Sequence, residues 1–386
     1  MFLGKRMKRI SLLLVLTLIT ASLPVLPAEA LAESDLKAPA AVLMDADTGT
    51  VLFEKNIHEV RACASITKVM TLLLVMEAIE EGRLHWEDTV TTSAHAASMG
   101  GSDIWLEPGE TMSVEEMVKA TIVASANDAA VALAETISGT EDAFVAAMNR
   151  KAQSLHMKET VFKNCNGLDE EGHVTSAYDV AVMSRELLKH PSILTYSGIW
   201  MDELRDGKTQ LVNTNKLLKS YDGITGLKTG TTSQAGSCIS ATAERDGLSL
   251  VAVVLGCPTG KDRFSDASAL LDFGFAHYTL VTPEVPAEAL RALPVKNGMM
   301  SSVGTTCRIQ DRILVEKGKG DAMRPTVYLP EVIEAPVEEG EVIGKVVYGN
   351  ENGGDRIAEY PIAASSSVPA VNFNDVMGLF LRCLAG

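Results

Sequence analysis

One stretch, residues 62–70, constrains the fold and the chemistry of this chain more than any other. Ser65 and Lys68 are three residues apart in it, and apolar residues follow at helical spacing: Ile66, Val69, Met70, Leu73, Leu74 and Met76. This pattern predicts a helix from Ser65 to about Glu81 that stops at Gly82. Because positions i and i+3 share one face of a helix, the Lys68 amine can reach the Ser65 hydroxyl.

A serine and a lysine in this arrangement can act as nucleophile and base. A serine hydroxyl is a poor nucleophile at neutral pH until a neighbouring base accepts its proton. Lysine can be that base when burial and a second cation lower its pKa. The same spacing recurs in a polar stretch at Ser34 and Lys37. The alternative reading of Ser65 and Lys68 is therefore a helix cap and a solvated lysine.

Two further motifs lie downstream, Ser125-x-Asn127 and Lys228-Thr229-Gly230. The first falls on a short connection between two predicted helices, a place from which side chains can point inward. The second precedes two predicted hairpin strands, at about 237–243 and 248–255, where an edge strand of an active site would lie. A K-T-G triplet is expected by chance in only about one such chain in ten.

The first 32 residues have the pattern of an export signal. Lys5, Arg6, Lys8 and Arg9 precede an apolar run, and Ala30-Leu31-Ala32 is a small-x-small cleavage site. We therefore expect an exported protein, at the outer face of the cytoplasmic membrane or in the cell-wall space. Cleavage takes Lys plus Arg from 34 to 30 and Asp plus Glu from 50 to 49, a net charge of −19. Such an acidic surface argues against nucleic acid as a partner.

The six cysteines and seven histidines show no metal-ligand spacing. With no C-x-x-C and no H-E-x-x-H, we predict neither a metal nor a cofactor. An exported chain can form disulfides, but a core of this size does not need them, and buried free thiols are expected. Cys63, two residues before Ser65, is interpreted as a small apolar residue packed behind the site rather than as a redox switch.

The order of elements predicts two folded domains. Residues 33–277 combine helices with an N-terminal and a C-terminal strand hairpin. Residues 278–362 consist of short apolar runs separated by Gly and Pro, which indicates a small all-β domain. Residues 363–386 are predicted to be a linker and an amphipathic tail helix. The tail is too short to span a bilayer, so it is either an interfacial membrane helix or a partner-docking helix.

S-x-x-K and K-T-G together in one exported chain are the signature set of class A β-lactamases and penicillin-binding proteins, and Ser125-Ala126-Asn127 is a variant of their S-D-N motif. From about Ala40 to the C-terminus the chain resembles the D-alanyl-D-alanine carboxypeptidases, the low-molecular-weight penicillin-binding proteins. The likeness includes residues 166–169 (Asn-Gly-Leu-Asp), Asp222-Gly223 and residues 262–264 (Asp-Arg-Phe). It implies an α+β fold: a β-lactamase/transpeptidase-like domain with an antiparallel sheet flanked by helices, then the all-β domain and the tail helix.

The resemblance also implies a role for each motif residue. Ser65 would attack the carbonyl between two D-alanines, and Lys68 would accept its proton. The backbone N–H groups of Ser65 and Thr231 would form an oxyanion hole. Ser125 would relay a proton to the leaving amine, and Asn127 would hold Lys68 and the substrate amide.

The remaining motif residues would recognise the substrate. Lys228, Thr229, Gly230 and Thr231, together with Arg263, would bind the peptide end, where charge-assisted contacts favour a free carboxylate. Lys228 would also be the second cation that lowers the pKa of Lys68. The alternative readings are a helix cap for Asn127, a strand filler for Thr229 and a surface ion pair for Arg263.

The function implied is a serine carboxypeptidase that removes the last D-alanine from peptidoglycan stem peptides and that β-lactams acylate and inhibit. A β-lactamase is the nearest rival, but its E-x-x-L-N pattern is missing from the nearest candidate, which begins at Glu159. A DD-endopeptidase of the same fold and a non-catalytic wall-binding scaffold are the two remaining rival functions. The expected partners are stem peptides, β-lactams and, through the C-terminal helix, the membrane surface.

Overall fold

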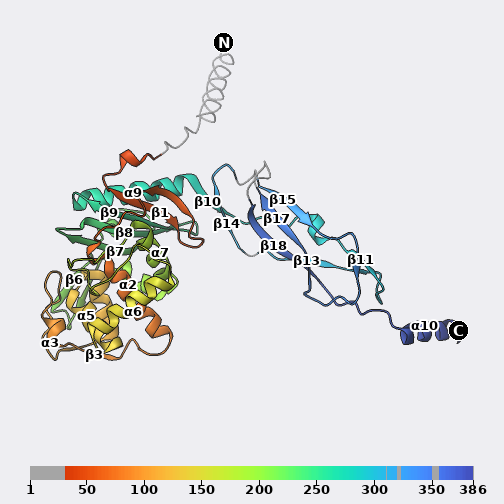
Figure 1. Cartoon of the computed structure of the whole chain (residues 1–386), viewed down its shortest axis with the longest axis horizontal. Helices are drawn as coiled ribbons and strands as arrows, with labels where there is room; N and C mark the ends of the chain where they lie inside the picture. The colour runs from red at the N-terminus through yellow and green to blue at the C-terminus, as the bar shows by residue number, and fades with distance from the viewer. Residues whose placement is uncertain (1–30, 310, 320–322, 350–355, 386) are drawn as a thin grey trace, which may run out of the picture.

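The computed structural model describes residues 31–309, 311–319, 323–349 and 356–385. The proposed signal segment, residues 1–32, lies outside this part of the chain except for its last two residues. Figure 1 shows a first body built from helices and a sheet, a second body built from strands, and the helix α10 (Phe373–Ala385) at the far end.

A five-stranded antiparallel sheet forms the centre of the first body, in the order β2-β1-β9-β8-β7. Its strands are β1 (Ala40–Asp45), β2 (Val51–Lys55), β7 (Ile224–Thr232), β8 (Gly236–Arg245) and β9 (Leu248–Cys257). Both predicted hairpins are present, and pairing of β1 with β9 joins them into one sheet. Strand β7, which carries K-T-G, lies at an edge, as predicted.

Helices cover both faces of this sheet. Ala40, Val42 and Met44 pack with residues of α2 (Lys68–Glu80) and α7 (Ala177–Leu188). The intervening Ala41 and Leu43 pack instead with residues of α9 (Gly260–His277). Successive residues of a strand point to opposite faces, so β1 is buried on both sides. An apolar run without polar alternation is the expected sequence for such a strand.

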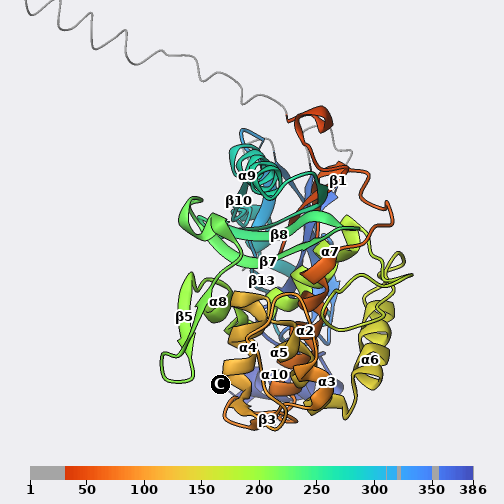
Figure 2. The same cartoon turned by 90° about the vertical axis from the view of Figure 1, so that its left-hand side faces the viewer.

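The other helices lie on the α2 side of the sheet, and Figure 2 shows α2, α4 and α5 below β7 and β8. They are α3 (Ala94–Ala97), α4 (Val114–Lys119), α5 (Asn127–Ser138), α6 (Glu141–Ser154) and α8 (Ser192–Ser197). Two small two-stranded sheets accompany them, β3 (Thr89–Thr91) with β4 (Thr111–Ser113) and β5 (Met201–Leu204) with β6 (Thr209–Val212). Helix α4 begins with a capping box formed by Ser113 and Glu116.

The start of the first predicted helix differs from the prediction. Ser65 lies in a 3-10 turn, η3 (Ala64–Thr67), and regular α-helix begins only at Lys68. Ala64 has a φ of 51°, in the left-handed region that a side chain disfavours. An α-helix cannot continue through that conformation. The 3-10 turn η3, which begins at Ala64, therefore precedes α2. Gly82 follows α2 with a φ of 68°, as predicted for a C-terminal glycine.

The second body begins where α9 ends at His277. It contains a four-stranded antiparallel sheet, a three-stranded sheet and the pair β10–β14. Its strands are β10 (Tyr278–Val281), β11 (Leu293–Lys296), β12 (Ser302–Val303), β13 (Thr305–Cys307), β14 (Ile313–Glu316), β15 (Arg324–Tyr328), β16 (Ile333–Glu334), β17 (Val342–Gly349) and β18 (Arg356–Ala364). The described part of this body is built from strands apart from one 3-10 turn, Ala287–Leu290.

The predicted linker from residue 363 onward is wrong in its first part. Strand β18 runs to Ala364, and the next residues stay attached to the β body through bridges between Val337 and Val368 and between Gly298 and Ala370. Val368 is fully buried in a small apolar cluster. Burial of this side chain anchors a stretch that was predicted to be a linker.

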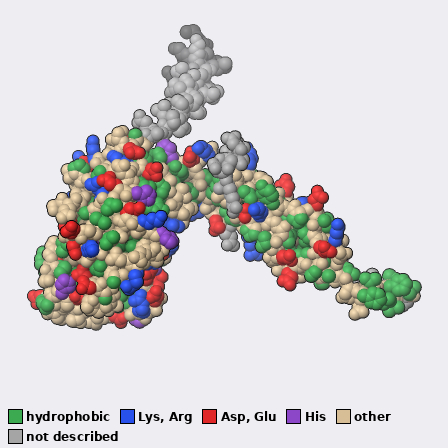
Figure 3. All heavy atoms as spheres, in the orientation of Figure 1, with side chains coloured by type: hydrophobic (Ala, Val, Ile, Leu, Met, Phe, Trp, Pro, Cys, Tyr) green, Lys and Arg blue, Asp and Glu red, His purple; other side chains and the backbone are tan. Residues whose placement is uncertain are grey.

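Helix α10 carries exposed apolar side chains, which Figure 3 shows as a green end of the molecule: Phe373, Val376, Phe380, Leu381 and Leu384. Within the described ranges, no helix combines the length and the apolar character needed to cross a membrane. All six cysteines are free thiols; five are buried as expected, and Cys383 in α10 is exposed.

Candidate active site

The turn η3 presents Ser65 at the sheet edge. Its neighbours Ala64, Ile66 and Thr67 are buried, whereas Ser65 is only half-buried and remains accessible. Cys63 is fully buried, and burial raises the pKa of its thiol to about 12. This thiol is therefore a packed, unreactive side chain, as expected from the sequence.

Lys68 is fully buried and makes three hydrogen bonds from its amine. Nζ lies 3.0 Å from Ser65 Oγ, 2.5 Å from Asn127 Oδ1 and 2.6 Å from the backbone oxygen of Asn166. The two carbonyl oxygens can only accept, so they take two N–H groups. When the amine is neutral, its lone pair is therefore left facing the Ser65 hydroxyl.

The middle motif lies across from Lys68, at the junction of two helices. A π turn (Ala120–Ala124) follows α4, and Ser125 ends it with a φ of 64°. That left-handed residue reverses the chain, so that Asn127 begins α5 with its side chain toward Lys68. The Asn127 amide nitrogen donates to the Gly100 oxygen at 2.6 Å. Both ends of the Asn127 side chain are thus fixed.

Strand β7 closes the other side. Lys228 is buried, and its Nζ donates to Ser125 Oγ at 2.8 Å and to the Thr229 oxygen at 2.9 Å. Thr229 Oγ1 donates to Thr214 Oγ1 at 2.7 Å. The predicted residues of all three motifs are therefore brought together: Lys68 forms hydrogen bonds with Ser65 and Asn127, and Lys228 forms one with Ser125.

Arg263 reaches the same strand from the first turn of α9. Its Nη1 donates to Thr231 Oγ1 at 2.8 Å and to the Gly230 oxygen at 3.0 Å. Arg263 forms no ion pair with any carboxylate among the described residues, so the alternative reading as a surface ion pair has no support there. Its guanidinium lies instead beside the end of the K-T-G motif.

The loop that holds Asn166 and Gly167 was not assigned a role from the sequence. The Asn166 carbonyl is one of the two carbonyl acceptors of Lys68, and a Cβ on Gly167 would lie 2.0 Å from the Ala64 oxygen. Gly167 therefore lets this loop touch the backbone of the turn η3, which carries Ser65. The available signal was the resemblance, which includes residues 166–169.

Burial dominates the electrostatics of the two lysines. It lowers the pKa of Lys68 to about 7, against the opposing effect of Cys165, Asp103 and Asp128. The second-cation effect expected on Lys68 falls instead on its neighbour: burial first, then Lys68 and Arg263, lower the pKa of Lys228 well below its ordinary value. Desolvation, rather than a second cation, is therefore what lowers the pKa of Lys68.

A pH dependence follows from the lowered pKa of Lys68. Only the neutral amine can accept the Ser65 proton, so acylation is expected to rise about tenfold per pH unit below pH 7 and to level off above it. At pH 5 the rate should be about a hundredth of the plateau. Stopped-flow or quenched labelling with a penicillin between pH 5 and 9 measures this profile, and a rate that is flat from pH 5 to 8 would contradict it.

Gly230 makes a close approach that can be tested by a single methyl group. A Cβ at this position would lie 2.7 Å from the Cys63 oxygen and 2.9 Å from the Ser65 backbone nitrogen. Gly230→Ala should push β7 away from the turn η3 and slow acylation about 100-fold, the cost of a misplacement of roughly 1 Å. Gly378→Ala in α10, where a Cβ meets nothing within 4 Å, is the control and should acylate at the wild-type rate.

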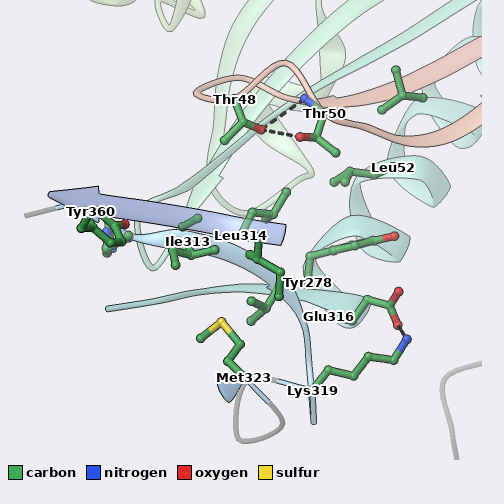
Figure 4. A pocket seen from close by; sticks show the side chains of 15 residues that line it. Thr48, Thr50, Leu52, Tyr278, Ile313, Leu314, Glu316, Lys319, Met323 and Tyr360 are labelled. Carbon is green, nitrogen blue, oxygen red and sulfur yellow. Dashed lines mark hydrogen bonds and ion pairs between the residues drawn. The ribbon is translucent and has the colours of Figure 1, made fainter. Parts of the chain in front are cut away.

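A cavity of about 680 Å³ lies elsewhere, between the β1–β2 hairpin and strands of the second body (Figure 4). Leu52, Tyr278, Leu314 and Met323 are among its lining side chains, and its ion pair is Glu316 with Lys319. It contains none of the motif residues. Among the residues that the structure describes, no group of three or more His, Cys, Asp or Glu side chains is placed to hold a metal ion.

Comparison with known proteins agrees with this geometry. Residues 27–259 match the model of the D-alanyl-D-alanine carboxypeptidase family, peptidase family S11, and residues 287–370 match the C-terminal domain of penicillin-binding protein 5. The chain is 43% identical over 341 residues to D-alanyl-D-alanine carboxypeptidase DacF of Bacillus subtilis, which covers 87% of each protein. It is 31% identical over 355 residues to DacC of Escherichia coli, covering 89% of this chain and 88% of DacC.

Solved structures that are similar to this chain are also penicillin-binding proteins. Penicillin-binding protein 5 from Haemophilus influenzae superposes with a TM-score of 0.75 at 31% identity, covering 89% of this chain and 100% of that one. Penicillin-binding protein D2 from Listeria monocytogenes, solved with ampicillin, gives a TM-score of 0.55 at 34% identity and covers 62% of this chain and 98% of that one. The α+β fold expected from the resemblance is confirmed, and the chain belongs to the D-alanyl-D-alanine carboxypeptidase family.

Proposed function

We propose that this protein removes the terminal D-alanine from peptidoglycan stem peptides through an acyl-enzyme on Ser65. One observation carries the proposal. Lys68 Nζ lies 3.0 Å from Ser65 Oγ, while two carbonyl oxygens occupy its other hydrogen-bonding positions. This arrangement supports a neutral amine that takes a proton from the serine and from no other group.

In acylation, the Ser65 oxygen bonds to the carbonyl carbon of the penultimate D-alanine as its proton passes to Lys68. The backbone N–H groups of Ser65 and Thr231 stabilise the oxyanion. The C–N bond then breaks, and the leaving nitrogen takes a proton from the Ser125 hydroxyl. Protonated Lys228, whose Nζ lies 2.8 Å from Ser125 Oγ, returns a proton to this oxygen. Transfer of one proton from Lys68 to Lys228 resets both amines. Water then adds to the ester, passes a proton to Ser65 through Lys68, and releases the shortened peptide.

We infer that the free carboxylate of the substrate binds at the K-T-G end of the site. Strand β7 contains Lys228 and Thr229, and Arg263 donates hydrogen bonds to its Gly230 and Thr231. Arg263 has no acidic partner in the described ranges. Two cationic side chains and a hydroxyl beside one strand form a suitable site for a carboxylate. This supports an exopeptidase that requires a free C-terminus.

β-lactams are proposed to acylate Ser65 and to remain attached. The relative from Listeria monocytogenes was solved with ampicillin bound. The Glu159 carboxylate, the nearest sequence candidate for a deacylating glutamate, lies 3.5 Å from His58 Nδ1 and accepts a hydrogen bond from Ser176. It therefore interacts with residues outside the Ser65 site.

The test is product analysis with purified protein. A peptide ending in D-Ala-D-Ala should lose one D-alanine, and the same peptide with an amidated C-terminus should not. Rapid turnover of a chromogenic cephalosporin would favour the β-lactamase instead, and cleavage of cross-linked muropeptide dimers would favour the endopeptidase. Failure of a fluorescent penicillin to label the protein would favour the scaffold.

We also propose that the protein is exported and held at the membrane surface by α10. The exposed apolar side chains of that helix support interfacial binding, in which an apolar face is buried at the headgroup boundary. Deleting residues 371–386 from the exported protein should move it from the membrane pellet to the soluble fraction. The variant Phe373→Ala, expressed alone, is the milder control because it removes one apolar side chain of the helix rather than the whole helix. Unchanged sedimentation of the deletion would contradict anchoring by the tail.

A further inference from the structure

His173 is a buried histidine with a partner on each ring nitrogen. It is 5% exposed and lies at the end of the loop formed by residues 163–173. The backbone N–H of Lys163, at the start of this loop, donates to Nδ1 at 3.2 Å, and Nε2 lies 2.7 Å from Thr67 Oγ1. Because Nδ1 accepts a hydrogen bond, the proton of the neutral ring is on Nε2, which donates to Thr67.

Thr67 continues this chain of hydrogen bonds into the turn η3. It lies between Ser65 and Lys68 in the sequence, and its Oγ1 donates to the Ala64 oxygen at 2.9 Å. Ala64 has the left-handed φ of 51° that directs the chain into η3. A residue with a side chain holds such a conformation only when its surroundings fix it. The hydrogen bonds from Lys163 through His173 and Thr67 to Ala64 are suited to do so.

The same ring also closes the loop that holds the base. The Lys163 N–H to Nδ1 bond joins the two ends of loop 163–173. Within the loop, the Asn166 oxygen accepts from Lys68 at 2.6 Å, and Gly167 contacts the Ala64 backbone so closely that a Cβ would lie 2.0 Å from its oxygen. His173 therefore contacts both the turn η3, which carries Ser65, and loop 163–173, whose Asn166 oxygen accepts from Lys68.

We propose that neutral His173 is a positioning residue that keeps Ser65 and Lys68 at reaction distance, through Thr67 on one side and loop 163–173 on the other. This inference rests on the proposed acylation of Ser65. The ring is neutral at working pH because burial lowers the pKa of His173 to about 4. The competing view is that His173 only fills space against Phe162, whose ring it meets edge-on at 5.8 Å.

His173→Phe separates these two views, because it keeps an aromatic ring against Phe162 and loses both hydrogen bonds. Acylation by penicillin, followed by intact mass, is expected to slow about 10- to 100-fold, as for other small misplacements of reacting groups. With a D-Ala-D-Ala peptide, kcat should fall while KM changes less than about twofold, since the groups on β7 are untouched. His173→Gln, whose amide N–H can still donate to Thr67, should recover most of the loss. The exposed His85 gives the control His85→Phe, which should behave as wild type.

A double-variant cycle with Thr67→Val makes the test specific. Thr67→Val removes one of the two paths through which His173 acts and His173→Phe removes both, so the double variant should be no slower than the slower single variant. Losses that multiply, or a folded His173→Phe that acylates at the wild-type rate, would overturn the inference. If His173→Phe does not fold, Thr67→Val and His173→Gln decide: slowed acylation of Thr67→Val with recovery in His173→Gln supports it, and wild-type rates in both overturn it. A wild-type protein that penicillin never acylates would instead refute the proposed function.

Discussion

Replacing Ser65 by alanine is expected to abolish covalent capture of penicillin and to lower D-alanine release by about 10⁴- to 10⁶-fold. The reason is that the other serine hydroxyl of the three motifs, that of Ser125, accepts a hydrogen bond from Lys228 and not from Lys68. No second serine in the three motifs lies within hydrogen-bonding distance of Lys68. Intact mass after incubation with penicillin G, and after incubation with a D-Ala-D-Ala peptide, measures the loss.

The chain contains its own matched control for this experiment. Ser34 repeats the S-x-x-K spacing with Lys37, yet both side chains are exposed at the N-terminal end of the described chain. Ser34→Ala should acylate at the wild-type rate. A mass adduct on Ser65→Ala, or loss of the adduct in Ser34→Ala, would contradict the assignment of the nucleophile. Because both serines have the same S-x-x-K spacing, comparing the two variants shows how much of the reactivity toward penicillin comes from the surroundings of Ser65.

The two S-x-x-K sites also show what sequence can and cannot predict. The spacing, the apolar residues that follow and the companion motifs identify Ser65, Lys68, Asn127 and Lys228, because these depend on side-chain identity and local periodicity. The hairpins followed from short strand-like runs joined by turn residues, and the edge position of β7 was expected from the place of K-T-G just before the second hairpin. Reactivity, however, depends on burial, which lowers the pKa of Lys68 to about 7. Burial is a property of the assembled core.

Backbone groups account for most of what the sequence analysis missed. The Asn166 oxygen that holds Lys68 is a carbonyl that any residue would supply at that position. The left-handed φ of Ala64 is likewise invisible in an alanine, which favours helix elsewhere. His173 has no motif around it, and its role depends on a contact with Thr67 across 106 residues. Such features follow from tertiary packing, so local patterns cannot predict them.

Lys68→Met is the second large effect expected, and it tests the base rather than the nucleophile. Methionine is unbranched and similar in length, so it can occupy the fully buried position, but it cannot accept a proton. Acylation of Ser65 should fall by about 10²- to 10⁴-fold, the usual contribution of general base catalysis. Lys37→Met, in the exposed copy of the motif, should leave the rate unchanged.

Two pH readouts make the Lys68→Met result specific to proton transfer. The residual acylation should lose the rise toward pH 7, because the titrating amine is gone. Stability should also change: between the native pKa of about 7 and the ordinary 10.5, the unfolded wild-type chain binds a proton at Lys68 that the folded chain does not. Wild-type stability therefore rises with pH in this window relative to Lys68→Met, by on the order of 1 kcal/mol per pH unit. Urea unfolding of both proteins at pH 7 and 9 measures the difference. An unchanged pH profile of acylation, together with a pH-independent stability difference, would mean that a group other than Lys68 accepts the proton.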